Sequence, residues 1–280
     1  MFSDILMTVD FDRTLTAPDS TIPQRNLDAI HYFMDNGGTF TVNTGRSIPS
    51  SCHNIIGKIP VNAPLLLYNG SADYDPNTGR FTRIVPLPLD RTAFLQDLQV
   101  QFPELHAEEQ GIDAHYLIHP DSNWESYCEN YRCAWSYGQP DAPFIKATLY
   151  GQFHKNTVAS MYEATAEELQ LFDRAIAYIT EKYADQVELF RACPRILDIH
   201  AKGVSKGKAA RSLQKQLGKK ILICVGDAEN DITMLENADY AFCPADGIVA
   251  DRYETVCECA KGAVADVIYK KIPKILHIQP

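Results

Sequence analysis

Two aspartates separated by one residue, Asp10 and Asp12, directly follow a mostly apolar run at residues 5–9. Such a run predicts a buried strand, and two like charges at its end repel each other unless something positive meets them. A second acidic group follows another apolar run near the other end of the chain: Asp227, Glu229 and Asp231. If the two groups meet, their charge calls for a divalent cation, and oxygen ligands without nearby His or Cys predict Mg²⁺.

Other residues that follow apolar runs are suited to bind a phosphate. Thr44 supplies a hydroxyl, Gly45 leaves its backbone N–H accessible, and a lysine of "KGVSKGK" supplies a positive charge. Together these groups could hold three phosphoryl oxygens while a metal ion neutralises the charge that develops on them. The residue types therefore predict a metal-assisted reaction at a phosphate group.

The elements predicted around these groups alternate between strand and helix. A helix is expected at about residues 23–35 with Leu27, Ile30 and Met34 on its buried side, and Ser205 is expected to cap another helix. "TFTVNTGR", "APLLLYNG" and "KILICVGD" predict strands. This order is typical of an α/β fold with a parallel sheet, whose carboxyl strand ends converge on one crevice where ligands bind.

The composition changes between about residues 85 and 194, where the chain becomes aromatic, polar and rich in turns. This block predicts strands such as "FIKATLYG" and "QVELFRA" and one long amphipathic helix, "TAEELQLFDRAIAYITEKYA". We therefore expect a discontinuous core of residues 1–84 and 195–280, and an inserted α+β domain of residues 85–194. A chain of 280 residues is long enough for two domains.

The net charge of −10 argues against nucleic acid or an anionic membrane as the main partner, since both require a basic face. No apolar run approaches the roughly 20 residues needed to cross a bilayer, and we expect no signal peptide. The eight cysteines form no C-x-x-C pair and show no zinc-type spacing with histidine. We expect reduced thiols and a cytoplasmic location; the oligomeric state stays open.

Four short motifs occur in the order "DFDRT", "NTGR", "GVSKG" and "GDAEND". They resemble the motifs of the haloacid dehalogenase superfamily of phosphohydrolases, and the insertion resembles the large α/β cap of its Cof-type sugar phosphatases. The similarity extends to "LLLYNGSADYD" and "FRACPRILDIHAKGVSKG". It implies a Rossmann-like core with an inserted cap that selects the substrate. It also implies Mg²⁺-dependent hydrolysis of a small phosphorylated metabolite, above all a sugar phosphate, through an aspartyl-phosphate.

The same resemblance implies a role for each motif residue. Asp10 would be the nucleophile and Asp12 the general acid and base. Both would contact the metal, Asp12 through its backbone carbonyl, together with Asp227 and Asp231. The phosphoryl group and the substrate would be bound by residues of three motifs: Thr44, Gly45, Lys206 and Asn230.

Two stretches depart from the family pattern. Arg13 stands where the family usually has Gly, and Pro244-Ala245-Asp246 stands where members often read Met-Gly-Asn-Ala. The second departure leaves the identity of the substrate open more than the type of reaction. Lys202 and Lys208 are alternatives to Lys206 as the phosphate-binding lysine.

Two other binding motifs do not fit the sequence, while two other functions do. A calcium-binding EF-hand loop fails because Leu15 and Thr21 stand where it needs Gly and Glu, and "GVSKGKA" lacks the spacing of a Walker A loop. A phosphosugar mutase and a non-catalytic sensor of phosphometabolites stay open, although a sensor needs no nucleophile beside an acid. In the insertion, Arg191 and Lys146 are candidate substrate contacts. Its aromatic residues fit a core or a pocket: Trp124, Tyr127, Tyr131 and Trp135.

Overall fold

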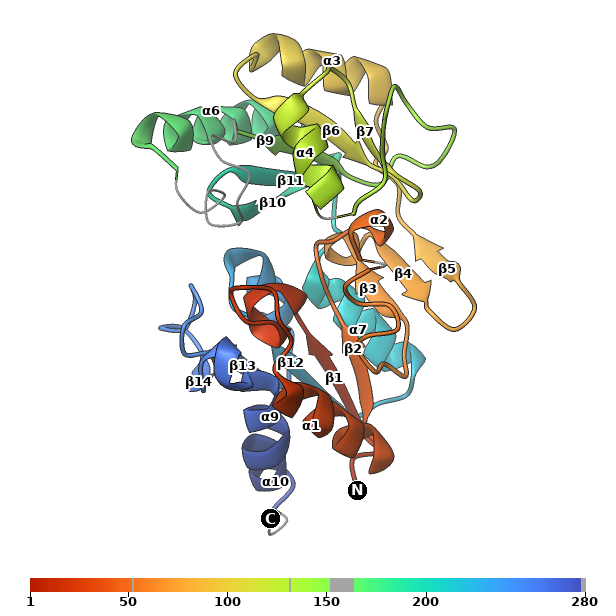
Figure 1. Cartoon of the computed structure of the whole chain (residues 1–280), viewed down its shortest axis with the longest axis vertical. Helices are drawn as coiled ribbons and strands as arrows, with labels where there is room; N and C mark the ends of the chain where they lie inside the picture. The colour runs from red at the N-terminus through yellow and green to blue at the C-terminus, as the bar shows by residue number, and fades with distance from the viewer. Residues whose placement is uncertain (52, 131, 152–163, 278–280) are drawn as a thin grey trace. The chain divides into compact units, whose positions relative to one another are not determined.

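The computed structural model describes residues 1–51, 53–130, 132–151 and 164–277 and divides the chain into two compact units (Figure 1). Unit 1 consists of Met1–Gly45, Ile56–Arg83 and Ser205–Pro280, and unit 2 of Arg46–Ile55 and Ile84–Val204. No helix among the described residues is long and apolar enough to cross a membrane.

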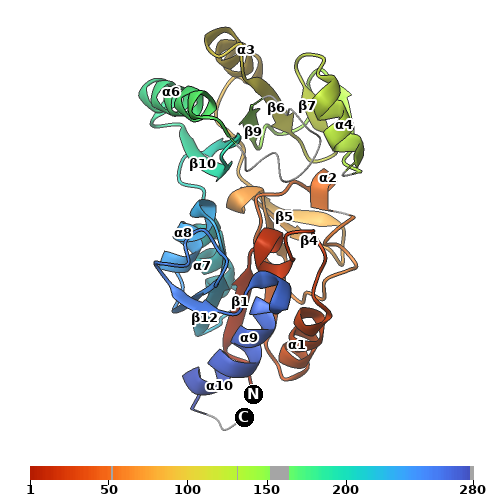
Figure 2. The same cartoon turned by 60° about the vertical axis from the view of Figure 1, so that its left-hand side comes forward.

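Unit 1 is built on a parallel sheet of five strands in the order β14-β13-β12-β1-β2. The interior strand β1 is buried along its whole length because helices cover both faces of the sheet. Figure 2 shows α7 and α8 on one side of β1 and α1 and α9 on the other. The five strands are β1 (Ile5–Val9), β2 (Thr39–Val42), β12 (Ile221–Val225), β13 (Tyr240–Pro244) and β14 (Glu254–Val256).

The helices of unit 1 begin and end close to the predicted positions. Helix α1 starts directly after Pro23, but Leu27 and Met34 are only partly buried. Asn26 is buried instead, because its amide donates to the Leu15 carbonyl and accepts the Ala265 N–H, both at 3.0 Å. The helices are α1 (Gln24–Asp35), α7 (Lys206–Gln216), α8 (Ile232–Glu236), α9 (Ala263–Asp266) and α10 (Ile272–Ile275); short helical turns span Phe11–Leu15, Tyr68–Gly70, Glu229–Asp231, Cys259–Lys261 and Val267–Lys271.

Among the described residues, the predicted third strand of the parallel sheet, β3 (Leu65–Leu67), joins that sheet through a one-residue parallel bridge between Asn43 and Leu66. After β3 the turn at residues 68–70 reverses the chain, so β3 pairs antiparallel with β4 (Ala72–Asp75). A small sheet of order β3-β4-β5 results, with β5 at Arg80–Ile84.

Unit 2 contains a six-stranded sheet in the order β10-β11-β9-β6-β7-β8, in which only β7 and β8 are described as parallel neighbours. The β10–β11 hairpin crosses residue 194, so this unit continues to Val204. Its strands are β6 (His106–Gln110), β7 (His115–Leu117), β8 (Trp135–Tyr137), β9 (Ala147–Tyr150), β10 (Val187–Cys193) and β11 (Ile196–Ala201); its helices are α2 (Ile48–Ser51), α3 (Arg91–Gln101), α4 (Ser122–Asn130) and α6 (Ala166–Tyr183).

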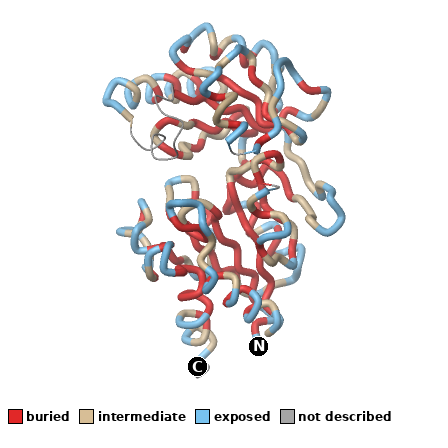
Figure 3. The backbone as a smooth tube through the Cα atoms, viewed as in Figure 1, coloured by how far each residue is buried: buried red, intermediate tan, exposed pale blue. Residues whose placement is uncertain are grey.

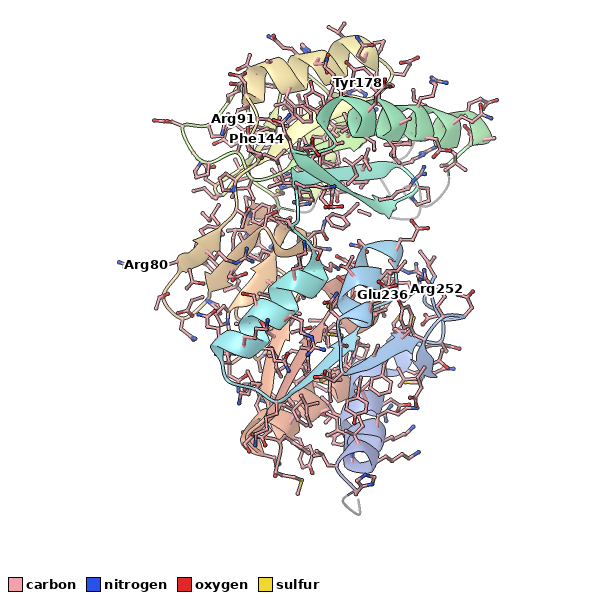
Figure 4. All side chains as sticks on the ribbon, turned by 180° about the vertical axis from the view of Figure 1, so that it is seen from behind. Arg80, Arg91, Phe144, Tyr178, Glu236 and Arg252 are labelled. Carbon is pink, nitrogen blue, oxygen red and sulfur yellow. The ribbon has the colours of Figure 1, made fainter. Side chains whose placement is uncertain are left out.

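Apolar side chains of α3 and α6 form the main core of unit 2 with one face of this sheet. Figure 3 shows the buried strands of each unit beneath more exposed helices. Figure 4 shows Arg91 at the start of α3 beside Phe144, and its guanidinium lies 5.6 Å from the centre of that ring. The core includes Phe94, Leu98, Leu149, Phe172, Ile179, Leu197 and Ile199.

Most of the aromatic residues that the sequence left open lie in a second cluster of unit 2. Trp124 is buried and stacks on Tyr127 and Tyr150, with ring centres 4.4 and 4.2 Å apart. Trp135 packs partly buried against the same cluster, whereas Tyr131 lies outside the described residues. Trp124 therefore belongs to the core.

Two cations proposed as substrate contacts form ion pairs within unit 2. The ammonium of Lys146 lies 2.8 Å from the Asp198 carboxylate, and both side chains are buried. The guanidinium of Arg191 lies 3.2 Å from the Asp173 carboxylate and donates to the Pro194 carbonyl. Breaking the buried pair would leave an uncompensated charge, which is costlier than losing an exposed pair.

Replacing Lys146 by Met should therefore lower the free energy of unfolding by about 3–5 kcal/mol, because Asp198 stays buried without its cation. The double variant Lys146→Met/Asp198→Leu should recover much of this loss. Urea denaturation of the full chain measures both. The control is Lys220→Met, which removes an exposed pair with Asp4 and should cost less than about 1 kcal/mol. Equal losses in Lys146→Met and Lys220→Met would contradict the assignment of a buried pair.

Candidate active site

Three acidic side chains predicted to meet do lie together at the carboxyl edge of the parallel sheet. Asp10 follows β1, and its N–H donates to the Val225 carbonyl of β12 at 2.9 Å. Asp227 lies two residues after that carbonyl. Carboxylate oxygens of Asp10, Asp227 and Asp231 lie within 4.8 Å of one another, and all three residues are buried. Glu229 is exposed and Asp12 is half-buried.

A buried lysine lies between two of these carboxylates. The Lys206 ammonium is 2.6 Å from Oδ1 of Asp10 and 2.6 Å from Oδ1 of Asp231, and the residue is fully buried. Burial alone would lower the pKa of Lys206, but Asp10 and Asp231 together raise it, so the ammonium stays charged. Lys202 and Lys208 are exposed. The structure thus brings only Lys206, of these three, to the carboxylates.

Two polar side chains hold the start of α7, where Lys206 lies, in place. Ser205 caps α7, as predicted, by accepting the Lys208 N–H at 3.2 Å. The buried Asn43 amide donates to the Lys206 carbonyl at 3.0 Å. Asn43 directly precedes Thr44, and its N–H bonds to the Val9 carbonyl of β1 at 2.8 Å. Sequence reasoning missed Asn43, since a polar residue at a strand end gives no sign of its distant partner.

The loop after β12 is shaped by Asp231. Its Oδ2 accepts the N–H groups of Asp227 and Ala228 at 3.0 and 3.1 Å. Gly226 permits this approach, because a Cβ there would lie 2.6 Å from the Cβ of Asp231. The hydroxyl of Thr14 donates to Oδ1 of Asp227 at 2.8 Å and fixes that carboxylate in turn.

The site carries more negative charge than Lys206 neutralises. Burial raises the pKa of Asp10 well above its usual value; Lys206 opposes this, while Asp231, Asp227 and Asp12 add to it. Burial and the neighbouring Asp231 raise the pKa of Asp227 to about 7. A buried set of carboxylate oxygens, closely spaced and short of positive charge, fits a hard divalent cation such as Mg²⁺.

A second group of predicted residues is joined by Asn69. The Asn69 N–H donates to the Thr44 carbonyl at 3.0 Å, and a Cβ on Gly45 would lie 2.9 Å from Oδ1 of Asn69. The Asn230 amide donates to the same Oδ1 at 3.4 Å. Asn69 therefore connects the second motif to the fourth. Asn69 lies at the end of the predicted strand "APLLLYNG", and its φ of 52° is in the left-handed region that asparagine tolerates in turns.

The structure shows the local surroundings of the two departures from the family pattern. Arg13 has a φ of 60°, in the left-handed region that favours glycine. Its N–H donates to the Thr16 hydroxyl at 3.2 Å. The Asp246 carboxylate accepts the Cys259 N–H at 2.9 Å and lies 3.1 Å from its Sγ, so Asp246 anchors the turn after β14.

Comparison with known proteins identifies the family. The model for haloacid dehalogenase-like hydrolases matches residues 7–250. The chain belongs to this family. The chain is 22% identical over 250 residues to the 5-amino-6-(5-phospho-D-ribitylamino)uracil phosphatase YitU of Bacillus subtilis, covering 88% of each protein. It is 25% identical over 252 residues to the HMP-PP phosphatase of Klebsiella pneumoniae, covering 85% of this chain and 82% of that one.

Solved structures of haloacid dehalogenase-like hydrolases share the fold. A hydrolase of this kind from B. subtilis matches with a TM-score of 0.76 at 17% identity, covering 95% of this chain and 99% of that one. The subclass IIB sugar phosphatase BT4131 matches with a TM-score of 0.74 at 15% identity, covering 98% and 99%. At such identities the likeness shows the fold alone. The predicted α/β fold, the family resemblance and the hydrolase class are confirmed.

The crowding of the carboxylates predicts a stability effect in protein freed of metal by a chelator. Because the pKa of Asp227 is raised from 3.8 to about 7, the folded chain holds this proton where the unfolded chain has lost it. The free energy of unfolding should therefore fall as the pH rises between these values. Asp227→Asn has no carboxyl group to titrate at this position and should not lose stability in this way. At about pH 8 its free energy of unfolding should exceed that of the natural chain by on the order of 1–4 kcal/mol.

Urea denaturation at about pH 4 and pH 8 measures this difference, which should nearly vanish at the lower pH. Added Mg²⁺ should stabilise the natural chain more than Asp227→Asn. Asp239→Asn is the control, since that carboxylate pairs with Arg211 at the surface. Burial acts to raise the pKa of Asp239, but the hydrogen bond from Arg211 and other contacts outweigh it, so the pKa is lowered. A variant Asp227→Asn less stable than the natural chain at pH 8 would show that the carboxylates are not crowded.

Proposed function

We propose that this hydrolase is a Mg²⁺-dependent phosphatase that acts on a small phosphomonoester, most specifically a sugar phosphate, through an aspartyl-phosphate. The observation that carries the proposal is the buried Lys206 ammonium held 2.6 Å from both Asp10 and Asp231, with Asp227 beside them. The names of the relatives, phosphatases of small phosphorylated compounds, support this class of substrate.

Asp10, Asp227 and Asp231, with the backbone carbonyl of Asp12, would hold the Mg²⁺, which when bound supplies positive charge against the phosphoryl oxygens. Lys206 adds a fixed positive charge beside Asp10. Since Oδ1 of Asp10 accepts from Lys206, its Oδ2 is the candidate attacking oxygen. Thr44, Gly45, Lys206 and Asn230 would bind and orient the phosphoryl group and the substrate.

In the first step Oδ2 of Asp10 forms a bond to phosphorus and the ester oxygen leaves with its electron pair, taking a proton from Asp12. In the second step Asp12, now a carboxylate, takes a proton from water. The resulting hydroxide bonds to phosphorus and the Asp10–phosphorus bond breaks, which releases phosphate and restores Asp10. Unit 2 would select the leaving group, as the predicted cap does. A cytoplasmic location is part of the proposal, supported by the free thiols of the described cysteines.

Metal removal is the first test. Exhaustive EDTA treatment should abolish phosphate release, because one lysine does not neutralise three buried carboxylates and a phosphate dianion. Mg²⁺ should restore turnover, while Ca²⁺, with its larger and looser coordination, should be a poor substitute. A phosphate-release assay over a panel of sugar phosphates measures this. Full activity after chelation would refute the metal-dependent mechanism.

The roles of Asp10 and Asp12 can be distinguished with substrates that have different leaving groups. Asp10→Asn removes the nucleophile, so no phosphoryl-enzyme should form. Asp12→Asn keeps it but lacks the proton donor, so release of a sugar alkoxide should slow by about 10²–10⁴-fold. A nitrophenolate leaves without a proton. With a nitrophenyl phosphate, Asp12→Asn should therefore give a burst and then stall as aspartyl-phosphate.

Rapid-quench kinetics and intact-protein mass should show an adduct on Asp12→Asn and none on Asp10→Asn. Asp19→Asn, an exposed carboxylate of the following loop, is the matched control and should behave as the natural enzyme. An adduct on Asp10→Asn, or equal rate losses with both leaving groups and no burst, would mean that the roles are assigned wrongly. A requirement for a sugar bisphosphate activator would instead indicate a mutase.

A further inference from the structure

Unit 2 contains a cluster of metal-binding side chains that takes no part in the proposed reaction. His115 of β7, Cys128 of α4 and Cys133, which precedes β8, are all buried, and one potential ligand atom from each lies within 4.8 Å of the others. The sequence showed no zinc-type spacing with histidine, because twelve residues that include most of α4 separate His115 from Cys128. The fold brings the three together.

The two nitrogens of the His115 imidazole have different surroundings. Its Nε2 lies 2.7 Å from the Ser47 hydroxyl. Its Nδ1 is buried and has no hydrogen-bond partner within the described part of the chain. An unsatisfied buried nitrogen is costly, and histidines that bind metals commonly donate their other N–H to a neighbouring oxygen. If Nε2–H donates to Ser47, Nδ1 keeps its lone pair and is free to bind an ion.

A fully buried carboxylate stands beside that nitrogen. Oε2 of Glu108 lies 3.5 Å from Nδ1 of His115, beyond hydrogen-bond geometry. Gln110 donates to Oε1 of Glu108 at 2.7 Å, and the Trp124 indole donates to Oε2, so the carboxylate is held in place. Ligand atoms about 2.0–2.3 Å from a tetrahedral zinc are about 3.3–3.8 Å apart, which matches the separation of Nδ1 and Oε2.

We propose that His115, Cys128 and Cys133, with Glu108 as the fourth ligand, form a structural zinc site in unit 2. Two sulfur ligands and one imidazole prefer a softer ion than the oxygen-only group around Asp10 does. The two sites are therefore expected to bind different metals. The thiols lose their protons on binding. The ion would fasten α4 and the segment after it to β7.

The test is a cobalt(II) titration of the reduced, metal-free full chain. Bonds from thiolate to cobalt give a charge-transfer absorption in the near ultraviolet that an oxygen-only site lacks, so the two sites are distinguished in one protein. We expect this band to saturate at one ion per chain and to disappear when zinc displaces cobalt. Cys128→Ser and Cys133→Ser should weaken the band and lower the affinity at least tenfold.

Cys193→Ser is the matched control, since this buried cysteine belongs to the same hydrophobic cluster but not to the ligand group. It should keep the full band. Ser47→Ala, which removes the partner of Nε2, should lower the affinity about 10- to 100-fold. The natural chain decides the question even where a variant fails to fold. No thiolate band at cobalt excess, or a Cys128–Cys133 disulfide in its place by mass, would overturn the proposal.

Discussion

The burial of Lys206 is the constraint on which the rest of unit 1 depends. A charged ammonium with no exposure to water is tolerated only where carboxylates surround it at hydrogen-bond distance. Those carboxylates come from the end of β1 and from the turn before α8, while the lysine begins α7. Each must be delivered by a separate backbone element. The order of strands in the sheet, with β12 beside β1, brings the loops that carry these carboxylates next to each other.

Several local features serve the same end. Gly226 gives Asp231 room to close its loop, Asn43 fixes the start of α7, and Thr14 holds Asp227. Arg13 adopts a left-handed backbone conformation that an L-residue enters at a cost. Such costs are typical of sites that a fold maintains for chemistry.

In unit 2 two buried carboxylates lie on one face of the sheet and are stabilised in two different ways. One face of its sheet is apolar and packs against α3 and α6, while the other carries Glu108, Thr148 and Asp198. Lys146 neutralises Asp198, with Thr148 donating to the same carboxylate. Glu108 instead receives two hydrogen bonds from neutral donors and stands beside His115, which makes it suited to a cation. Each buried carboxylate on this face of the sheet therefore needs a positive group beside it: Lys146 serves Asp198, and the proposed ion would serve Glu108.

The sequence by itself determined several local elements of this protein and the family to which it belongs. Apolar runs ended by acidic residues located β1 and β12, Ser205 marked the start of α7, and four motifs in order identified the family. These signals work because they are carried by neighbouring residues, whose spacing sets both backbone conformation and chemistry. The choice of Lys206 over two other lysines also followed from the position of one residue within its motif.

Only the tertiary structure decided what depends on residues far apart in the chain. The buried side of α1 was predicted only in part. Ile30 is buried as expected, but Asn26 is buried as well because it has partners at Leu15 and Ala265, which the helical period does not reveal. The antiparallel pairing of β3 depended on a turn whose direction the sequence left open. Asn69 contacts Asn230, and His115, Cys128 and Cys133 lie close together, only because the fold brings these distant residues into contact. Contacts of this kind are set by the packing of whole elements, which no short stretch of sequence encodes.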